Sequence, residues 1–335
     1  MTEKIMIGNK AVGEGEPTFI IAEVGSNHNQ NLEQAKKLIE IAAECQVDAV
    51  KFQLFKTDIL YSKSDQLYDL FKKSELPHEW VKELKEYSEK RGLIFLASPF
   101  DKESIDLLDS LGIQAFKWAS SETTNLSLLK YAADKKKPLI ISTGMCNLAD
   151  IYEALEVAKS CGNKDIALLQ CTSLYPTKAA GVNLRAMDTL KNAFHLPVGY
   201  SDHTLSITAS IAAVARGACI IEKHFTVDRK MEGLDHYYAL EPSELKAMVE
   251  AIRETKECLG SPLKEMLPEE RVLARRESIF AKNDLQKNTI LKEDDLIIRR
   301  PAAGIETRFL KVVMEQKLKS NLKKGDPLTW NGLRS

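Results

Sequence analysis

Eight short apolar segments, each followed by a longer segment of helical period, constrain the fold of this chain most strongly. The strand candidates are rich in Val, Ile, Leu and Phe, and they span Phe19–Val24, Ala49–Gln53, Ile94–Ala97, Ala115–Ala119, Leu139–Ser142, Ala167–Cys171, Val198–Tyr200 and Cys219–Lys223. Between them lie segments such as 32–45, in which apolar residues recur on one helical face. Continuous apolar strands that alternate with helices indicate a buried parallel sheet.

Eight such units predict an α/β fold of the TIM (β/α)8 barrel type. A doubly wound sheet is the rival, but it does not usually need eight strands, and no G-x-G-x-x-G motif follows the first strand. We assign residues 1–260 to the barrel, 261–277 to a linker and 278–335 to a small module. That module shows short strand candidates at Ser278–Ala281, Asp295–Arg299 and Asp326–Trp330.

The composition argues against nucleic-acid and membrane partners. Among 335 residues, 47 Lys and Arg nearly balance 48 Asp and Glu, so no global field favours a polyanion. The six cysteines are scattered without a C-x-x-C pair, which is typical of reduced cytosolic thiols. The first six residues are too polar for a signal peptide, and no apolar run approaches membrane-spanning length. We therefore expect a cytoplasmic protein.

Polar residues stand at the C-terminal ends of the predicted strands, where side chains of a barrel point into the active site. They are Glu23, Lys51, Gln53, Ser98, Lys117, Ser120, Glu122, Ser142, Ser173, Ser201, Asp202, His203, Lys223 and His224. A lone Ser there is more often a helix cap than a ligand. A Lys inside an apolar strand needs an anion, either a structural carboxylate or a substrate. Lys51 and Lys117 at one barrel end favour a bound phosphate or carboxylate.

His203 and His224 end the last two predicted strands, which are neighbours in a barrel. Two neutral imidazoles there, with Asp202 and Glu222 nearby, predict a divalent metal that polarises a carbonyl group. Mn²⁺ or Mg²⁺ suits an oxygen-rich site, with Co²⁺ or Zn²⁺ as alternatives. His28, in the first strand-to-helix loop, either touches a ligand or belongs to a polar cluster at a helix start.

Glu23 and Glu122 are the candidate general acid and base. Burial raises the pKa of a carboxyl group, whereas a metal and two lysines nearby lower it, so the sequence does not assign which carboxyl group is protonated.

These residues stand in motifs that resemble the sialic acid synthase family. The motifs are Ile20–His28, Val50–Gln53, Ser98–Phe100, Phe116–Glu122, Ser142–Met145, Cys171–Thr177, Tyr200–Thr204, Ile221–Thr226, Gly233–His236 and Arg299–Ile305. The resemblance covers nearly the whole chain in order, and the last motif is similar to the family's antifreeze-like (SAF, β-clip-like) domain. It implies an enzyme that condenses phosphoenolpyruvate with N-acetylmannosamine or a related N-acylated amino-hexose. The products are a nine-carbon 2-keto sugar acid and phosphate.

The resemblance also implies residue roles. His203 and His224 would bind the metal, expected to be Mn²⁺. The residues that would hold phosphoenolpyruvate are Lys51, Ser98, Lys117, Ser120, Ser142, Ser173 and Ser201. Those that would face the sugar or the reacting carbon are Glu23, Gln53, Tyr175 and Asp235, while Glu122 would assist proton movement. Arg300 would reach the barrel mouth of a partner subunit and contact the acylamino group, which predicts a domain-swapped homodimer.

Departures from the family pattern leave alternatives open. Ser173 stands where members often carry Asn, and the loop Leu54–Pro77 differs most from the neuraminate enzymes, so a legionaminate- or pseudaminate-type synthase or a spore-coat polysaccharide enzyme are alternatives. A Schiff-base aldolase using Lys51, Lys117 or Lys223 is a rival of another class. A non-catalytic carbohydrate-binding protein is suggested only by the C-terminal module.

Overall fold

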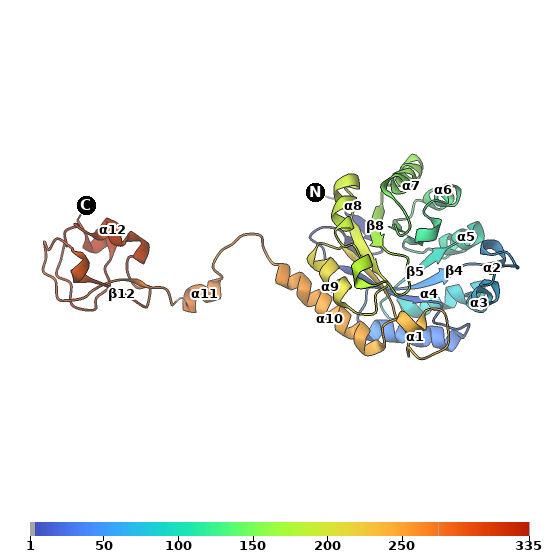
Figure 1. Cartoon of the computed structure of the whole chain (residues 1–335), viewed down its shortest axis with the longest axis horizontal. Helices are drawn as coiled ribbons and strands as arrows, with labels where there is room; N and C mark the ends of the chain where they lie inside the picture. The colour runs from blue at the N-terminus through green and yellow to red at the C-terminus, as the bar shows by residue number, and fades with distance from the viewer. Residues whose placement is uncertain (1–3, 274, 335) are drawn as a thin grey trace. The chain divides into compact units, whose positions relative to one another are not determined.

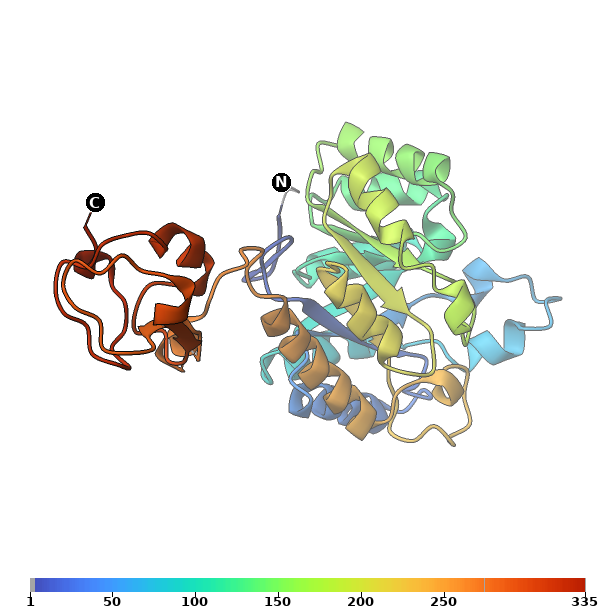
Figure 2. The same cartoon turned by 60° about the vertical axis from the view of Figure 1, so that its left-hand side comes forward.

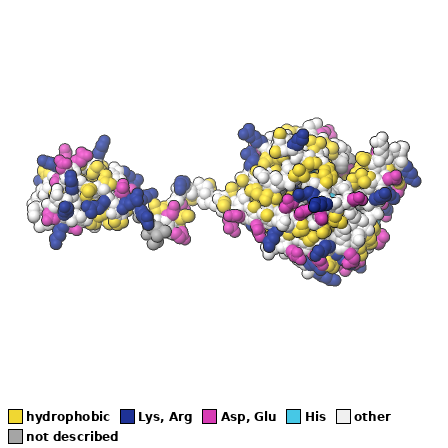
Figure 3. All heavy atoms as spheres, turned by 60° about the horizontal axis from the view of Figure 1, so that its bottom comes forward, with side chains coloured by type: hydrophobic (Ala, Val, Ile, Leu, Met, Phe, Trp, Pro, Cys, Tyr) yellow, Lys and Arg dark blue, Asp and Glu magenta, His cyan; other side chains and the backbone are white. Residues whose placement is uncertain are grey.

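The computed structural model describes residues 4–273 and 275–334 and divides them into two compact units. The first unit ends at Gly260, and the second begins at Ser261. Positive and negative side chains are interspersed over the face shown in Figure 3, in line with the net charge of −1. In the described ranges, no helix is both long enough and apolar enough for a membrane span.

The first unit is a closed barrel of eight parallel strands, as the sequence predicts (Figure 1). Strand β10 pairs with β3 and closes the ring, and the other neighbours follow the order of the chain. The strands are β3 (Phe19–Gly25), β4 (Ala49–Leu54), β5 (Ile94–Pro99), β6 (Phe116–Trp118), β7 (Leu139–Ser142), β8 (Ile166–Cys171), β9 (Val198–Asp202) and β10 (Ile220–His224). Nearly all their residues are buried, because helices cover the outside and side chains fill the inside.

Eight helices form the outer layer. They are α1 (Leu32–Glu44), α4 (Val81–Glu89), α5 (Lys102–Ser110), α6 (Leu126–Ala133), α7 (Leu148–Ser160), α8 (Ala186–Phe194), α9 (Thr208–Ala215) and α10 (Pro242–Leu259). In α1 the buried residues Ala35, Leu38 and Ile39 recur at helical spacing and face the strands. The side chains of Asn31 and Asp101 cap α1 and α5 by accepting backbone N–H groups of the first turn.

A short antiparallel hairpin precedes the barrel, and the sequence analysis does not predict it. Its strands are β1 (Ile5–Ile7) and β2 (Lys10–Val12). Ile5, Ile7 and Val12 are buried in one apolar cluster with interior residues of the barrel such as Phe19 and Leu96. The hairpin therefore covers the N-terminal end of the barrel interior and leaves the C-terminal end as the open mouth.

The segment between β4 and α4 carries two further short helices, α2 (Thr57–Leu60) and α3 (Tyr68–Lys72). Figure 2 shows this light-blue segment projecting from the edge of the barrel unit. It follows the C-terminal end of β4, so it belongs to the mouth side of the barrel.

The second unit contains an antiparallel pair, β11 (Ser278–Ala281) and β12 (Leu296–Arg299), and the short helix α12 (Leu310–Val313). Its core gathers buried residues such as Ile279, Leu291 and Leu328. The prediction of a third strand at Asp326–Trp330 is wrong: Pro327 makes one isolated bridge to Phe280, and a 3-10 helix (Trp330–Gly332) begins where the strand would end. The predicted linker also contains a short helix, α11 (Pro268–Leu273).

Gly199 in β9 supplies a test of barrel packing. A Cβ atom there would collide with the carbonyl oxygen of Ile220 and lie 2.7 Å from Leu169 Cδ2. We expect Gly199→Ala to lower the free energy of unfolding by about 1–3 kcal/mol, the usual cost of overpacking, in urea titrations followed by circular dichroism. Gly181→Ala is the control, because its Cβ would meet nothing closer than 3.6 Å. Equal stability of both variants would contradict this packing.

Candidate active site

The parallel register brings the polar strand ends together at the mouth of the barrel. His224 is aligned with Glu23, Glu23 with Lys51, and Gln53 with Ser98. A narrow cavity there is lined by Glu23, Lys51, Gln53, Ser98, Lys117, Ala119, Ser120, Ser142, Cys171, Tyr175, Ser201, His203, Glu222 and His224. These include eleven of the residues that the sequence analysis assigned to catalysis, substrate or metal, and they come from all eight strands or the loops that follow them.

Four buried charged side chains form the floor of this narrow cavity. Lys51 Nζ lies 2.9 Å from Glu23 Oε1 and 3.9 Å from Glu222 Oε1, and Lys117 Nζ lies 3.5 Å from the same Glu222 oxygen. Each ammonium also reaches a hydroxyl oxygen, Ser98 Oγ at 3.1 Å from Lys51 and Ser142 Oγ at 2.7 Å from Lys117. The anions that the two lysines require are thus supplied in part by the protein itself.

The four groups have unequal pKa values because burial and pairing oppose one another. Burial raises the pKa of Glu23 to about 7, against the pull of Lys51 and with repulsion from Glu222. Burial also lowers the pKa of Lys117, although Glu222 opposes it. For Lys51 and Glu222 burial disfavours charge, but the opposite charges outweigh it, so the pKa of Lys51 is raised and that of Glu222 is lowered. Glu23 is therefore the carboxyl group that can exchange a proton near neutral pH.

Three buried oxygen atoms at the mouth have no hydrogen-bond partner within the described part of the protein. They are Glu23 Oε2, Glu222 Oε2 and Ser173 Oγ. Burying such a group without a partner costs free energy. All three belong to residues that line the cavities of the mouth, so a ligand bound there would satisfy them.

His203 and His224 face the same space, with ring centroids 5.5 Å apart. His203 Nδ1 lies 2.9 Å from the carbonyl oxygen of Thr172, so it must donate. His224 Nδ1 lies 3.3 Å from the Tyr238 hydroxyl, whose own proton goes to Asp235 Oδ1 at 2.6 Å. Both rings therefore carry their proton on Nδ1 and leave Nε2 as a free lone pair.

The donor set of the two imidazoles fits a divalent cation. Burial lowers the pKa of His224 to about 4, so this ring is neutral at physiological pH and can act as a ligand. Each Nδ1–H group donates to an oxygen atom of the protein, and a hydrogen bond of this kind orients metal-binding histidines. Over residues 4–273 and 275–334, no group of three or more His, Cys, Asp or Glu side chains is arranged for a metal. Water and substrate oxygens would supply the other ligands.

Hydroxyl groups converge on the turn that follows β7 and form a cradle. The Gly144 N–H donates to Ser120 Oγ at 2.9 Å, and the next residue, Met145, has a left-handed backbone with φ 62°. A Cβ on Gly144 would collide with Ser173 Oγ and lie 2.8 Å from Ser120 Oγ. Converging hydroxyl groups of this kind can donate hydrogen bonds to a phosphate or carboxylate.

Beyond the narrow cavity lies a wider one of about 600 Å³. Both cavities are lined by Gln53, Ala119, Ser120, Tyr175 and His224, so these residues form a throat between them. The wider cavity also contains Glu122, Ser173 and Asp235, which completes the sequence-predicted set within the first unit. Asp235 Oδ2 accepts the backbone N–H and the hydroxyl of Ser26, both at 2.8 Å.

Three residues of the first unit that the sequence suggested, Asp202, Lys223 and His28, line neither cavity. Lys223 is paired with Asp202 at 3.0 Å, because side chains alternate along β10 and place it opposite to Glu222 and His224. His28 is buried and accepts the Gln30 N–H through Nδ1, and it is not among the residues that line either cavity. Arg300 belongs to the second unit, and its role in a partner's site stays a prediction.

Several residues that line the mouth have no predicted role. Glu222 stands two residues before His224, and strand alternation places both on one face, which is a signal that sequence reasoning could have used. Cys171, the last residue of β8, lies with Sγ 3.8 Å from His203 Nδ1. The aromatic residues Phe55, Tyr61 and Phe71 come from a loop without regular hydrophobic periodicity, so nothing in the sequence pattern marks them.

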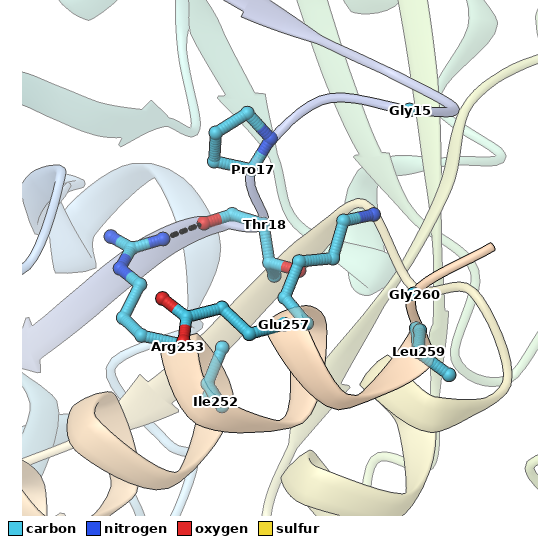
Figure 4. Close-up of a pocket in the computed structure, with 9 residues that line it drawn as sticks. Gly15, Pro17, Thr18, Ile252, Arg253, Glu257, Leu259 and Gly260 are labelled. Carbon is cyan, nitrogen blue, oxygen red and sulfur yellow. Dashed lines mark hydrogen bonds between the residues drawn. The ribbon is translucent and has the colours of Figure 1, made fainter. Parts of the chain in front are cut away.

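A separate hollow of about 540 Å³ lies at the opposite end of the barrel, where β3 begins and α10 ends. Figure 4 shows the Arg253 guanidinium donating to the carbonyl oxygen of Thr18. The same guanidinium contacts Asp48 Oδ2 at 2.8 Å. These contacts tie α10 to the N-terminal ends of the strands, which in α/β barrels is the end associated with stability.

The fold and the mouth define an α/β barrel in which two buried lysines and several hydroxyl groups lie beside paired imidazoles. A model of the NeuB family matches residues 38–264, and a model of the SAF domain matches residues 276–334. The N,N'-diacetyllegionaminic acid synthase of Legionella pneumophila is 41% identical over 349 residues, with 98% of each chain covered. The N,N'-diacetyllegionaminic acid synthase of Campylobacter jejuni is 46% identical over 306 residues, which cover 86% of this chain and 92% of the Campylobacter protein.

A solved structure supports the same family. The N-acetylneuraminic acid synthetase of Leptospira borgpetersenii, in complex with citrate, matches with a TM-score of 0.78 at 36% identity, over 82% of this chain and 95% of that one. The chain therefore belongs to the NeuB family of sialic acid-type synthases, and its second unit is a SAF domain.

Gly144 supplies a test of the anion cradle. We expect Gly144→Ala to weaken binding of phosphoenolpyruvate, the anion that the resemblance implies, by about 10- to 100-fold because the methyl group displaces Ser120 and Ser173. The affinity for phosphoenolpyruvate is measured by calorimetric titration, and Gly181→Ala is the matched control. Unchanged affinity in a folded Gly144→Ala protein would place the anion elsewhere.

Proposed function

We propose that this protein condenses phosphoenolpyruvate with N-acetylmannosamine or a related N-acylated amino-hexose and water, giving a nine-carbon 2-keto sugar acid and phosphate. A carbon–carbon bond forms between the methylene carbon of the enol and the sugar aldehyde. Water adds to the enol carbon, and the bond from that carbon to the phosphate oxygen breaks. The observation that carries the proposal is the placement of two buried lysines and a hydroxyl cradle beside two imidazoles with free Nε2 atoms.

The residues of the narrow cavity would bind and orient the anionic substrate. Lys51 and Lys117 offer two positive charges, and Ser120, Ser142 and Ser173 offer hydroxyl groups for phosphate and carboxylate oxygens. Ser98 and Ser201 complete this set. Fixed donors of this kind hold the enol in one orientation and stabilise charge that develops on the departing phosphate.

The remaining groups would act at the sugar and on protons. A divalent cation, expected to be Mn²⁺, would be held by His203 and His224 and would make an aldehyde carbon more electrophilic. Glu23 accepts a hydrogen bond from Gln53 Nε2 at 2.9 Å, and its pKa of about 7 suits it to hold or release a proton. The Tyr175 ring lies 4.2 Å from the His203 ring and lines both cavities, so it would face the sugar or the reacting carbon.

A Schiff-base aldolase is less well supported by the geometry. Lys51 is ion-paired and its pKa is raised, while Lys223 lines neither cavity. Lys117 lines the narrow cavity and burial lowers its pKa, so it is the remaining candidate nucleophile, but its ammonium group contacts Glu222 and Ser142. We also propose that Arg300 completes the partner's site in a domain-swapped homodimer. The protein would work in the cytoplasm, in keeping with its six free cysteines.

The first test is phosphate release. With phosphoenolpyruvate and a panel of N-acylated hexosamines, we expect phosphate only when an acceptor is present, one per enol consumed. Lys117→Ala should lower kcat/KM by about 100- to 1,000-fold, because a donor to the reacting anion is lost, whereas the exposed Lys164→Ala should not. Borohydride trapping of a covalent adduct without phosphate release would instead establish the aldolase.

The second test concerns the metal. Excess EDTA should abolish turnover, and Mn²⁺ should restore it. His224→Ala should lower Mn²⁺ affinity by at least about 100-fold, as measured by calorimetry on the folded protein. Loss of a group that only hydrogen-bonds to a metal ligand would have a smaller effect. His78→Ala, which lies outside both cavities, is the control. Full activity in EDTA, or unchanged Mn²⁺ affinity of His224→Ala, would refute the assignment of the two imidazoles.

A further inference from the structure

Four aromatic rings form one wall of the wider cavity, and we refer to Phe55, Tyr61, Phe71 and Phe100 as the aromatic wall. The rings of Tyr61 and Phe71 stack at 4.5 Å, and Phe55 meets both Phe71 and Phe100 edge to face at 5.9 Å. None of the four lines the narrow cavity. The aromatic wall therefore lies beyond the throat.

Polar contacts fix the segment between β4 and α4, which carries Phe55, Tyr61 and Phe71. Asp58 Oδ2 lies 2.9 Å from Lys72 Nζ, which joins α2 to α3. Glu75 Oε1 accepts the Thr57 N–H at 2.5 Å. Gln30, from the loop after β3, donates through Nε2 to the carbonyl oxygens of Lys72 and Glu75 at 3.0 and 3.1 Å. These contacts hold Tyr61 and Phe71 against the mouth of the barrel.

The charged residues that line the wider cavity are acidic, whereas the narrow cavity pairs two lysines with two carboxyl groups. The acidic residues of the wider cavity are Glu122 and Asp235, and among the described residues that line it there is no Lys or Arg. Burial acts to raise the pKa of Asp235, but interactions with His224, Tyr238 and Ser26 outweigh it and hold this pKa below its usual range. The Asp235 carboxylate is therefore already paired within the protein. A second anion in this cavity would meet carboxylates and aromatic rings.

We propose that the acceptor is an uncharged sugar whose end away from the aldehyde is apolar, and that the aromatic wall selects it. This rests on the proposed function, because the aldehyde must pass the throat to reach the imidazoles and the enol. The six-carbon chain then extends through the wider cavity, and its far end meets the rings. A methyl group or acyl methyl group there gains apolar contact, whereas a hydroxyl group loses water and meets ring carbons, with the Tyr61 hydroxyl as the one polar atom of the four rings.

The expected preference follows from these contacts. One methyl group in an apolar pocket is worth about 10- to 200-fold in discrimination. A phosphate group at the same end would be rejected more strongly, because a desolvated anion needs a cation or several donors. The order of preference should be the deoxy acceptor first, the hydroxylated acceptor second and the phosphorylated acceptor last.

Binding of non-reacting acceptors tests this order independently of turnover. N-acetylmannosaminitol, its 6-deoxy form and its 6-phosphate are open-chain analogues that lack the aldehyde. Calorimetric titration of the full-length protein in Mn²⁺ buffer should give the 6-deoxy form at least about tenfold tighter binding than the parent alditol. The 6-phosphate should bind more weakly than both.

Substitutions in the aromatic wall then test whether its rings cause this preference. Phe71→Ala should reduce the preference for the 6-deoxy form to less than about threefold, because the apolar contact is lost, while leaving phosphoenolpyruvate affinity unchanged. Phe71→Leu should keep most of the preference, because it remains apolar. Tyr152→Ala, an exposed aromatic on α7, is the matched control and should behave as the wild type.

The outcomes separate this inference from the proposed function. Equal affinities, a reversed order or no binding of the 6-deoxy alditol would overturn the inference, even if phosphate release is observed with some acceptor. The predicted order together with no phosphate release from any acceptor would overturn the proposed function and leave the selectivity of the cavity established. A preference that persists in Phe71→Ala would remove the aromatic wall as its cause.

Discussion

The buried cluster of Glu23, Lys51, Lys117 and Glu222 is the constraint on which the rest of this structure depends. Its members come from β3, β4, β6 and β10, so they meet only when the barrel is closed by the pairing of β10 with β3. Ion pairs of this kind cost desolvation, and removal of one partner leaves an uncompensated buried charge, an effect of about 3–5 kcal/mol. The strand register, the closure of the ring and the chemistry of the mouth are thus linked by one set of contacts.

The site has two layers with different physical character. The narrow cavity is charged, rich in hydroxyl groups and mostly inaccessible, and the wider cavity above it is aromatic and slightly acidic. The imidazoles of His203 and His224 lie at the junction, because His224 lines both. An anion fits the lower layer, and a largely neutral molecule fits the upper one. This division supports a reaction between two different substrates rather than a transformation of one.

The part of the fold and site that the sequence predicts is the part built on strands. Apolar runs identified the eight strands, and polar residues such as Lys51 and Lys117 were visible because they interrupt those runs at a consistent place. On irregular segments, Tyr175 and Asp235 were predicted only through the resemblance to a family. Phe71 and Tyr238 were missed, because they reach the mouth through tertiary contacts that no period encodes. The N-terminal hairpin was missed because its strands are three residues long, and the third strand of the SAF domain was wrong because Pro327 makes a single bridge there.

The most direct test of the central claim is a crystal structure of the protein with Mn²⁺ and phosphoenolpyruvate. The account predicts anomalous density for manganese in contact with Nε2 of both His203 and His224. It also predicts the enol's phosphate and carboxylate between the two ammonium groups and the Gly144 cradle. Manganese bound through other side chains, or the enol outside the narrow cavity, would contradict it.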